Sequence, residues 1–576
     1  MVDIILGVIR EGLLFSIMAL GVYITYKILD FPDLSVDSTF PLGAAVTAML
    51  ILKDVNPYVT LLAALLAGAI AGTITGIIHV VFKVRDLLSG IIVMTGLYAI
   101  NLRIAGSANV AIFSRDNIFE NKFMDKIIPQ SLEKYSYIIV LAILVIIVKL
   151  VLDWYLKTKS GLLLRAVGDN DVLVTSVAKN KGIAKIVGLA IANAFAALAG
   201  SAYCQMNGFF EISSGTGTMV IGLASVIIGT KLLKNIKFVK ATSAVIFGSI
   251  IYKACISIAI NMGMEASDLK LITAVLFLLF FTRLFVSERK QIAFMADEKS
   301  PVRNYHRFFA ISCSEMRIKM LELKNINKYY NPGTVNQMCL FKDFNFQVQD
   351  GEFVSIVGSN GSGKTSMLNI ICGSIPVDSG KIYIGEEDIT NKKEHIRHKI
   401  IGRVYQNPAM GTSPNLTILE NMSLADNKGK MYGLSSGINK KRKEDYREML
   451  RELNLGLEDK LNVKVGALSG GQRQAMALIM STLTPIEFLI LDEHTAALDP
   501  KTAEIIMQLT DKIVKEKKLT TMMVTHNLRY AVEYGDRLVM MHKGNVVLDI
   551  KGEDKKNVKI DDLLDEFNKI SIECGN

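Results

Sequence analysis

The chain has 576 residues, of which half are hydrophobic, and its formal net charge is +10. It is too long for one ordinary domain, and a mean hydropathy of +0.34 excludes an ordinary soluble protein. Long apolar runs stop near residue 286 and dense charge begins there, so we predict a membrane half followed by a soluble half. Basic cytoplasmic loops explain the positive charge, and we favour them over nucleic-acid binding.

Nine apolar segments precede residue 290, and several have the ~20 residues needed to cross a bilayer core. They cover residues 12–27, 39–53, 57–82, 87–106, 136–152, 183–206, 215–233, 241–262 and 269–286. Segment 39–53 is short and follows Pro32, so a re-entrant or broken helix fits it better than a full span. The chain therefore crosses eight or nine times, and the side of the N-terminus stays open. The first run lacks a small-residue cleavage site, so we expect it to be retained.

Lysine and arginine mark alternate loops of this half. They gather within 149–181, 231–240 and 283–290, whereas the loop with Glu265 and Asp268 is acidic. Because cytoplasmic loops carry the excess of lysine and arginine, we expect a multi-pass protein of the cell membrane with its soluble half in the cytoplasm. Six cysteines without a C-x-x-C spacing indicate reduced thiols.

Small and polar residues within the spans carry two structural predictions. Small residues such as Gly68, Gly72 and Gly200 let helix backbones approach, so we expect helix packing there rather than a pore lining. Polar groups are costly in lipid and must face protein or water. The polar groups are Asn101, Arg103, Asn193 and Lys253, and for Arg103 and Lys253 snorkelling to the interface is the alternative.

The loop from Thr158 to Asn170 combines an apolar stripe with flanking charge. It fits an amphipathic cytoplasmic helix and an ordinary solvated loop equally well. Its stretch from Ser160 onward resembles the cytoplasmic coupling loop of permeases in the branched-chain amino acid and simple-sugar import family, and residues 34–45 resemble that family's loop after the first helix. The most similar subgroup is the one for aromatic amino acids. The resemblance implies import of an amino acid, delivered by an external solute-binding protein.

Residues 291–317 are polar and contain Pro301, and we predict that they link a membrane domain at 1–290 to a nucleotide-binding domain at 318–576. The chain from Met316 reads like the start of an independent polypeptide, so we infer a fusion of two units that related systems keep separate. The predicted fold is a polytopic all-α membrane domain followed by an α/β P-loop domain. An amphipathic stretch at 560–567 is expected to be a packing helix.

The soluble half contains a glycine-rich loop between an apolar run, 353–357, and a helix-like stretch, 367–372. Strand, loop and helix in this order are the context of a phosphate-binding loop, in which glycines let backbone N–H groups approach phosphate oxygens. The helix N-terminus adds a favourable dipole for an anion. The expected nucleotide-binding residues here are Gly358, Ser359, Asn360, Gly361, Ser362, Gly363, Lys364, Thr365 and Ser366.

Further motifs follow in order. Gln406 comes after a short predicted strand, and residues 468–472 have the sequence Leu-Ser-Gly-Gly-Gln. The apolar run 488–492 ends in a carboxylate, and the apolar run that begins at Met522 ends in His526. Each alone has a plain structural reading as a helix cap, a turn or a structural histidine. Together they resemble the motif set of ATP-binding cassette proteins over about 250 residues. His494 departs from that family, in which proline is common at this position.

The resemblance implies ATP and Mg²⁺ as cofactors and a role for each motif residue. Asp492, Thr365 and Gln406 would hold Mg²⁺, and Gln406 would also report to the membrane domain. Glu493 would orient or deprotonate the attacking water, and His526 would contact the γ-phosphate. The remaining nucleotide contacts would come from Tyr330, with Tyr329 as the near alternative, and from Ser469, Gly470, Gly471, Gln472 and Asp499.

The Leu-Ser-Gly-Gly-Gln motif of this family closes on ATP held by a partner's phosphate loop. One chain carries one copy of each half, so we expect a homodimer or a pair with a similar chain in the lipid membrane. The function expected is ATP-driven import of a small solute, with an aromatic ahead of a branched-chain amino acid. The alternatives are an importer of a nucleoside or simple sugar, an exporter, and a membrane-anchored ATPase regulator.

Overall fold

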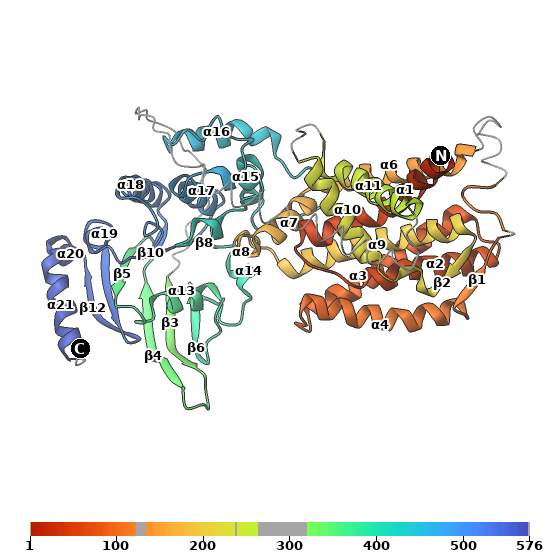
Figure 1. Ribbon diagram of the computed structural model, residues 1–576. Coiled ribbons are helices and arrows are strands. Elements are labelled where there is room, and N and C mark those ends of the chain that lie inside the picture. The colour runs from red at the N-terminus through yellow and green to blue at the C-terminus, as the bar shows by residue number, and fades with distance from the viewer. Residues whose placement is uncertain are drawn as a thin grey trace. The chain divides into compact units, whose positions relative to one another are not determined.

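The computed structural model describes residues 2–113, 115–121, 134–234, 236, 239–262 and 320–573. The chain forms two compact units (Figure 1). The helical unit contains Met1–Gly168 and Gly182–Ser300, and the α/β unit contains Asp169–Lys181 and Pro301–Asn576. The segment 169–181 therefore belongs to the α/β unit, although it lies between membrane segments in the sequence. The predicted linker at 291–317 and the apolar segment 269–286 lie outside the described residues.

Seven described helices are long and apolar enough to cross a membrane. They are α1 (Val2–Val22) with the π-helix η1 (Tyr23–Ile28), α3 (Pro57–Val80), α4 (Asp86–Ala105), α6 (Ser136–Tyr155), α9 (Lys181–Asn207), α10 (Thr218–Leu232) with the 3₁₀ turn η3 (Ile212–Gly215), and α11 (Ala241–Asn261). The predicted short segment is α2 (Val36–Leu52), a 17-residue helix that contains Pro41. Every apolar segment within the described residues is therefore helical, and segment 39–53 forms one continuous helix up to Leu52 rather than a broken one.

Short elements connect these helices. The strands β1 (Asn109–Ala111) and β2 (Phe209–Glu211) pair antiparallel. The loop after α6 forms α7 (Lys159–Asp169), the amphipathic helix that was one of the two readings of this stretch, and α8 (Asp171–Ser176) follows. The apolar residues of α7, among them Leu162 and Leu163, are buried.

Small residues bring the membrane helices into backbone contact. A Cβ atom on Gly72 of α3 would lie 2.2 Å from the carbonyl oxygen of Leu189 on α9. A Cβ atom on Gly200 of α9 would lie 1.8 Å from the carbonyl oxygen of Phe40 on α2. No side chain fits at either distance, so these helices pack through their glycines. The predicted packing role of the small residues is confirmed.

Buried polar groups in the helical unit have hydrogen-bond partners. Asn101 of α4 donates to the carbonyl oxygen of Ser38, at 2.9 Å. Asn193 of α9 donates to the carboxylate of Asp33, at 2.7 Å. The prediction that these polar groups face protein is therefore confirmed for Asn101 and Asn193.

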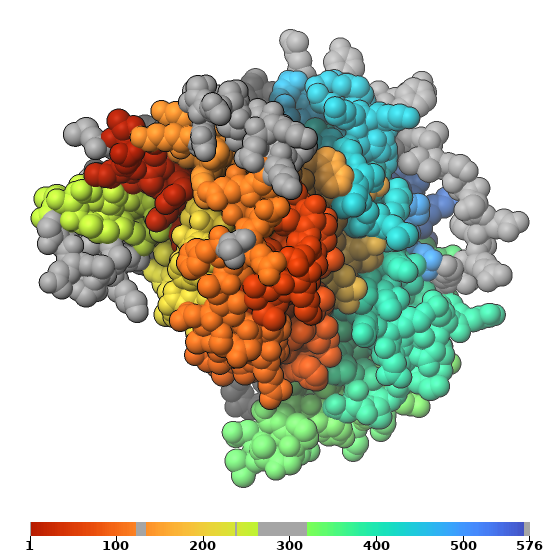
Figure 2. Space-filling model, turned by 90° about the vertical axis from the view of Figure 1, so that its right-hand side faces the viewer, coloured from red at the N-terminus to blue at the C-terminus, as the bar shows by residue number. Residues whose placement is uncertain are grey.

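The outer surface of the helical unit is apolar. Large exposed side chains include Leu62, Leu66 and Ile70 on α3 and Leu88 and Ile92 on α4. Figure 2 shows part of this surface in orange. An apolar surface of this extent suits contact with lipid.

Two sheets form the frame of the α/β unit. The first has the order β12-β11-β5-β10-β9-β8. Its edge strand β12 runs antiparallel to β11, and every other pair of neighbouring strands is parallel. The second, antiparallel, has the order β4-β3-β6-β7. The first contains β5 (Phe353–Gly358), β8 (Ile401–Val404), β9 (Phe488–Asp492), β10 (Thr520–Val524), β11 (Arg537–His542) and β12 (Asn545–Lys551), and the second contains β3 (Leu321–Tyr330), β4 (Met338–Val348), β6 (Ser379–Ile384) and β7 (Glu387–Asp388).

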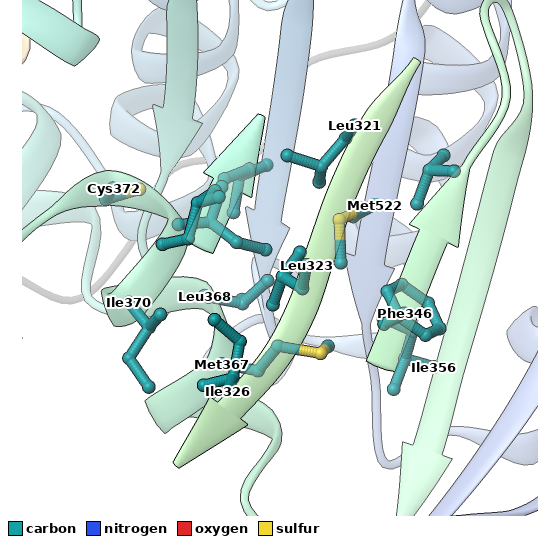
Figure 3. Packing of buried hydrophobic residues seen from close by; sticks show 14 of the residues in the cluster. Leu321, Leu323, Ile326, Phe346, Ile356, Met367, Leu368, Ile370, Cys372 and Met522 are labelled. Carbon is teal, nitrogen blue, oxygen red and sulfur yellow. The ribbon is translucent and has the colours of Figure 1, made fainter. Parts of the chain in front are cut away.

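Helices cover both faces of the parallel strands. The helix α13 (Lys364–Cys372) packs between the sheets, where Met367 and Leu368 meet Leu323 and Ile356 in one buried cluster (Figure 3). The helices α17 (Gly470–Thr482) and α18 (Pro500–Lys517) bury the opposite face. The remaining helices are α14 (Glu394–Arg397), α15 (Ile418–Asp426), α16 (Lys443–Arg451), α19 (Leu528–Glu533), α20 (Glu553–Asn557) and α21 (Ile560–Glu573). Leu563 of α21 is buried against β11, so the tail is a packing helix, as predicted.

The α/β unit contains a fully buried histidine directly after α14. Nδ1 of His398 lies 3.4 Å from the carbonyl oxygen of Ile401, and its Nε2 has no hydrogen-bond partner. Burial, together with the nearby charges of Lys428 and Arg403, lowers the pKa of His398 to about 3. The fold therefore favours the neutral imidazole.

Acid should destabilise the α/β unit through His398. Its folded pKa lies below the unfolded value of 6.5, so its contribution to stability is complete above pH 6.5 and is lost as the pH falls toward 3. We expect the thermal midpoint of the full chain to fall from pH 6.5 to pH 5, with His398 contributing at most about 1.4 kcal/mol per pH unit. His398→Leu should flatten this slope, and an unchanged slope in the variant would contradict the assignment.

Candidate nucleotide site

The phosphate-binding loop lies between β5 and α13, as the sequence predicts. Gly363 precedes α13 with a φ of 101°, a conformation that favours glycine. Lys364 is buried, and its ammonium donates to the carbonyl oxygens of Gly358 at 2.7 Å and Ser359 at 2.9 Å. Burial lowers the pKa of Lys364, and the carboxylates of Glu493 and Asp492 oppose that shift. The ammonium thus lies over the loop, where a phosphate would be a stronger, charge-assisted acceptor.

Glu493 is the centre of the predicted catalytic group. One of its carboxylate oxygens accepts a hydrogen bond from the amide of Gln406 at 2.8 Å, and the other lies 2.7 Å from Nε2 of His526. These three residues come from the ends of the parallel strands β8, β9 and β10, where ligands bind in open α/β sheets. The three residues predicted to be catalytic are therefore brought together.

The backbone of Glu493 is held in an unusual conformation. Its φ is 46°, which is uncommon for a residue with a side chain and costs of order 1–3 kcal/mol. Its N–H donates to the carbonyl oxygen of Val524 on β10, at 2.9 Å. The neighbouring strand thereby fixes the direction of the carboxylate.

Two predicted nucleotide contacts cap helices. The hydroxyl of Ser469 accepts from the N–H of Gln472, and the Gln472 side chain accepts from the N–H of Ser469 at 3.1 Å, a capping box at the start of α17. Asp499 caps α18 by accepting from the N–H of Thr502, at 3.1 Å. In the described part of the chain, neither side chain hydrogen-bonds the phosphate loop. Their contact with nucleotide stays a prediction.

Tyr330 is placed closer to the phosphate loop than its alternative. Its hydroxyl lies 3.5 Å from the Ser366 hydroxyl, and its ring packs on the core beside α13. The adjacent Tyr329 pairs with Cys339 of β4, and its N–H donates to Asp378 at 2.6 Å. The geometry thus favours Tyr330 as the aromatic residue near a bound base.

Comparison with known proteins follows the division into two halves. The family described as "ABC transporter" matches residues 341–496, and that described as "Branched-chain amino acid transport system / permease component" matches residues 4–282. A tyrosine transport ATP-binding protein of Clostridioides difficile is 48% identical over 248 residues, which are 43% of this chain and 98% of the relative. A tyrosine transport system permease protein of that organism is 47% identical over 277 residues, 48% of this chain and 90% of the relative.

The chain is an ABC transporter. Its permease half and its ATPase half, which match two separately named relatives, are joined in one polypeptide, and the transporter couples ATP hydrolysis to transport. Among solved structures, a dimeric post-hydrolysis state of the ATP-binding cassette MJ0796 bound to ADP and Pi is 34% identical, with a TM-score of 0.35, and it covers 40% of this chain and 98% of its own.

The residues near the phosphate loop fit a Mg²⁺ ion. The Thr365 side chain is exposed at the start of α13, and Asp492 ends β9 with 11% of its side chain exposed. Among the described residues no cluster of three or more His, Cys, Asp or Glu side chains could hold a metal by itself. Mg²⁺ commonly takes one or two carboxylates together with substrate phosphates. In the transporter, Asp492 and Thr365 would supply the protein's share, and Gln406, the third expected ligand, donates its side-chain amide to Glu493.

Arg403 is a partner of this site that sequence reasoning missed. Its guanidinium donates to the Asp492 carboxylate at 2.7 Å and to the Asn369 side chain on α13 at 2.8 Å. Its side chain is 5% exposed, so the pair is shielded from water. Arg403 therefore ties β8 to the end of β9 and to the helix of the phosphate loop. A cation inside the short apolar strand 401–404 was the sequence signal that could have revealed it.

Arg403→Met should destabilise the nucleotide-free transporter by about 3–5 kcal/mol, because it leaves Asp492 buried without its cation. Bound MgATP would offer this carboxylate a positive partner. The rise of the thermal midpoint on adding MgATP should therefore be larger in the variant than in the unmodified transporter. Arg403→Lys keeps the charge, so its rise in thermal midpoint should lie between the rises of the other two proteins. Equal rises in all three proteins would show that Arg403 does not hold Asp492.

The segment 169–181 attaches to the ATPase half through polar contacts. The side-chain amide of Asn170 donates to the carbonyl oxygens of Ala409 at 2.8 Å, Met410 at 2.9 Å and Thr412 at 2.7 Å. The Asp169 carboxylate accepts from the Ser413 hydroxyl and from the N–H and side-chain amide of Asn415. Asp169 and Asn170, the last two residues of the loop expected at 158–170, thus bind the ATPase half.

The departure from the family at His494 has a structural explanation. Its side chain is 2% exposed, and its Nε2 lies 3.2 Å from the Thr510 hydroxyl on α18. Burial lowers the pKa of His494 to about 4. The residue therefore packs as a neutral, buried side chain in the position after Glu493.

Proposed function

We propose that this transporter imports an aromatic amino acid, tyrosine first, across the cell membrane. One observation carries the proposal: both halves independently match, at 47–48% identity, relatives named for tyrosine transport. The proposal places the ATPase half in the cytoplasm and includes an external solute-binding protein that delivers the substrate. Two copies of the chain would form the working assembly.

In this proposal Glu493 receives a proton from the water that attacks the γ-phosphate. Its hydrogen bond with Gln406 and its contact with His526 hold the carboxylate in place before the reaction. Lys364 would bind the β- and γ-phosphates, and His526 would stabilise charge that develops during transfer. Ser469, Gly470 and Gly471 of one copy would contact the nucleotide bound to the other.

The segment 169–181 is proposed to pass the movement of the ATPase half to the membrane helices. Asn170 is its central anchor, because one amide serves three carbonyl oxygens between 409 and 412. These carbonyls follow Gln406 closely in sequence, so a movement of the glutamine reaches them directly.

Asn170→Ala should uncouple hydrolysis from transport. Loss of these hydrogen bonds, each worth about 1 kcal/mol, should lower uptake by roughly tenfold or more. ATP hydrolysis should remain within about threefold of normal, because no catalytic contact is touched. A parallel loss of both activities would contradict this role. Ser176→Ala, which removes one hydroxyl contact with Tyr405 at 3.0 Å, is a milder control.

Substrate identity can be tested by uptake in cells that lack their own aromatic amino acid transport. Cells carrying the transporter and its solute-binding protein should take up labelled tyrosine. Unlabelled tyrosine, phenylalanine or tryptophan should compete better than leucine or valine. If a nucleoside or a sugar competed and no amino acid had any effect, the substrate would be of that class and not an aromatic amino acid.

A further inference from the structure

A charged pair lies in the middle of two membrane helices. Glu11 lies within α1 and Lys253 within α11, and the Lys253 ammonium is 3.0 Å from the Glu11 carboxylate. The Lys253 side chain is 12% exposed and that of Glu11 49% exposed. Charged groups at this depth are costly in lipid and commonly mark a transport pathway. The pairing also shows that Lys253 does not simply snorkel, which was one sequence-based alternative.

Close helix packing fixes the level of this pair. A Cβ atom on Gly12 of α1 would lie 2.8 Å from the Cα atom of Ile250 on α11. The Ser249 hydroxyl donates to the Gly12 carbonyl oxygen at 2.8 Å. The backbones of α1 and α11 therefore touch beside the charged pair, which cannot shift far along either helix.

One aromatic ring adjoins the pair, and two more pack against that ring. The Lys253 ammonium lies 4.0 Å from the centre of the Phe15 ring, a favourable cation–π contact. The Phe15 ring is parallel to that of Phe40 on α2, with centroids 5.9 Å apart. Tyr203 of α9 is tilted against both, at 6.4 Å from Phe15 and 5.5 Å from Phe40. Four helices thus contribute one cluster of a cation, a carboxylate and aromatic rings.

The members of this cluster match the parts of an aromatic amino acid. A zwitterion needs one cation for its carboxylate and one anion for its ammonium, and an aromatic side chain packs well on rings at an angle to it. The half-exposed Glu11 carboxylate keeps one end of the cluster accessible. A purely structural ion pair would need none of the three rings.

We propose that Glu11 and Lys253, with Phe15, Phe40 and Tyr203, form a binding site for an aromatic amino acid on its path through the membrane half. Lys253 binds the substrate carboxylate, Glu11 binds its ammonium group, and the half-buried ring of Tyr203 contacts its side chain, with the buried rings of Phe15 and Phe40 packed behind it. The site rests on the proposed import of aromatic amino acids and identifies the residues that would select them.

The test compares Lys253→Met, Glu11→Gln and the exchange Glu11→Lys with Lys253→Glu. Each variant is expressed in full length with the solute-binding protein, and labelled tyrosine uptake is normalised to correctly folded protein in the membrane. The single changes should lower uptake by roughly ten- to a hundredfold, as expected for loss of a charged hydrogen bond. The exchange restores the ion pair but reverses its direction, so uptake should stay low.

A matched control is the pair of Lys149 and Asp153 in α6, which has the same separation of 3.0 Å. Lys149→Met should leave tyrosine uptake within about twofold of that of the unmodified transporter, because Asp153 keeps Lys240 at 2.9 Å as a partner. Tyr203→Leu and Phe15→Leu, which both remove a ring, should narrow the preference for tyrosine over leucine in competition.

Recovery of uptake in the exchange variant would overturn the site, because it would reduce the pair to a structural role. An unchanged preference for tyrosine over leucine in both ring variants would contradict the proposed selection of aromatic side chains by these rings. Failure of the proposed function is distinguishable, since the unmodified transporter would then take up no aromatic amino acid, and that result would remove the site with it.

Discussion

Glu493→Gln is expected to lower ATP hydrolysis by about 100-fold or more while ATP affinity changes by only a few fold. General acid–base groups contribute roughly 10²–10⁴-fold to a rate, and an amide cannot accept the proton of the attacking water. Glutamine has nearly the shape of glutamate and can keep one hydrogen bond with Gln406, which lies 2.8 Å from the carboxylate now. The phosphate loop is untouched, so ATP should bind and remain.

The measurement is single-turnover hydrolysis together with retention of labelled ATP on the purified transporter. The variant should hold ATP for many normal turnover times, and its dimeric, nucleotide-bound form should accumulate. His526→Gln is the matched comparison, because it changes the other partner of Glu493, at 2.7 Å, and leaves the carboxylate. Hydrolysis at the normal rate in Glu493→Gln would show that Glu493 does not accept the proton of the attacking water.

Ser469→Asp is expected to abolish hydrolysis without unfolding the transporter. Aspartate caps a helix about as well as serine, so the start of α17, which Ser469 now caps, should persist. In the proposed dimer, however, the new carboxylate would face the phosphates bound to the other copy. We expect hydrolysis to fall by about 100-fold, with ATP binding to the variant's own phosphate loop retained.

Mixing this variant with Lys364→Met tests the shared site directly. Each variant alone should be inactive, because both of its sites carry one defect. A mixed dimer has one site in which Lys364 of one copy meets Ser469 of the other, so ATP trapping at that site should return. Trapping absent from co-purified mixed dimers would contradict the arrangement. Ser469→Ala controls for the cap, since it should cost about 1 kcal/mol of stability without adding charge.

The nucleotide site could be predicted largely from local sequence, because its parts are contiguous motifs at the ends of strands. The phosphate loop, the carboxylates after 488–491 and His526 all lie where strand, turn and helix patterns indicate. Even the small residues of α3 and α9 could be assigned to packing, since their spacing reports a helix face.

Contacts between distant segments could not be predicted. Arg403 bonds Asp492 across 89 positions, and Glu11 pairs with Lys253 across 242. Nothing in the local pattern states which charges meet, because that depends on the order of strands and the packing of helices. The membership of 169–181 in the α/β unit likewise depends on its hydrogen bonds with residues near 410.

The most direct test of the account is tyrosine transport by the purified transporter in sealed proteoliposomes. Vesicles would contain ATP and Mg²⁺, and the outside would contain labelled tyrosine with the solute-binding protein. The transporters with their ATPase half inside should accumulate tyrosine in the lumen, and vesicles made with Glu493→Gln should not. Accumulation that ignores ATP, or ATP-driven loss of tyrosine preloaded into the lumen, would contradict an ATP-driven importer.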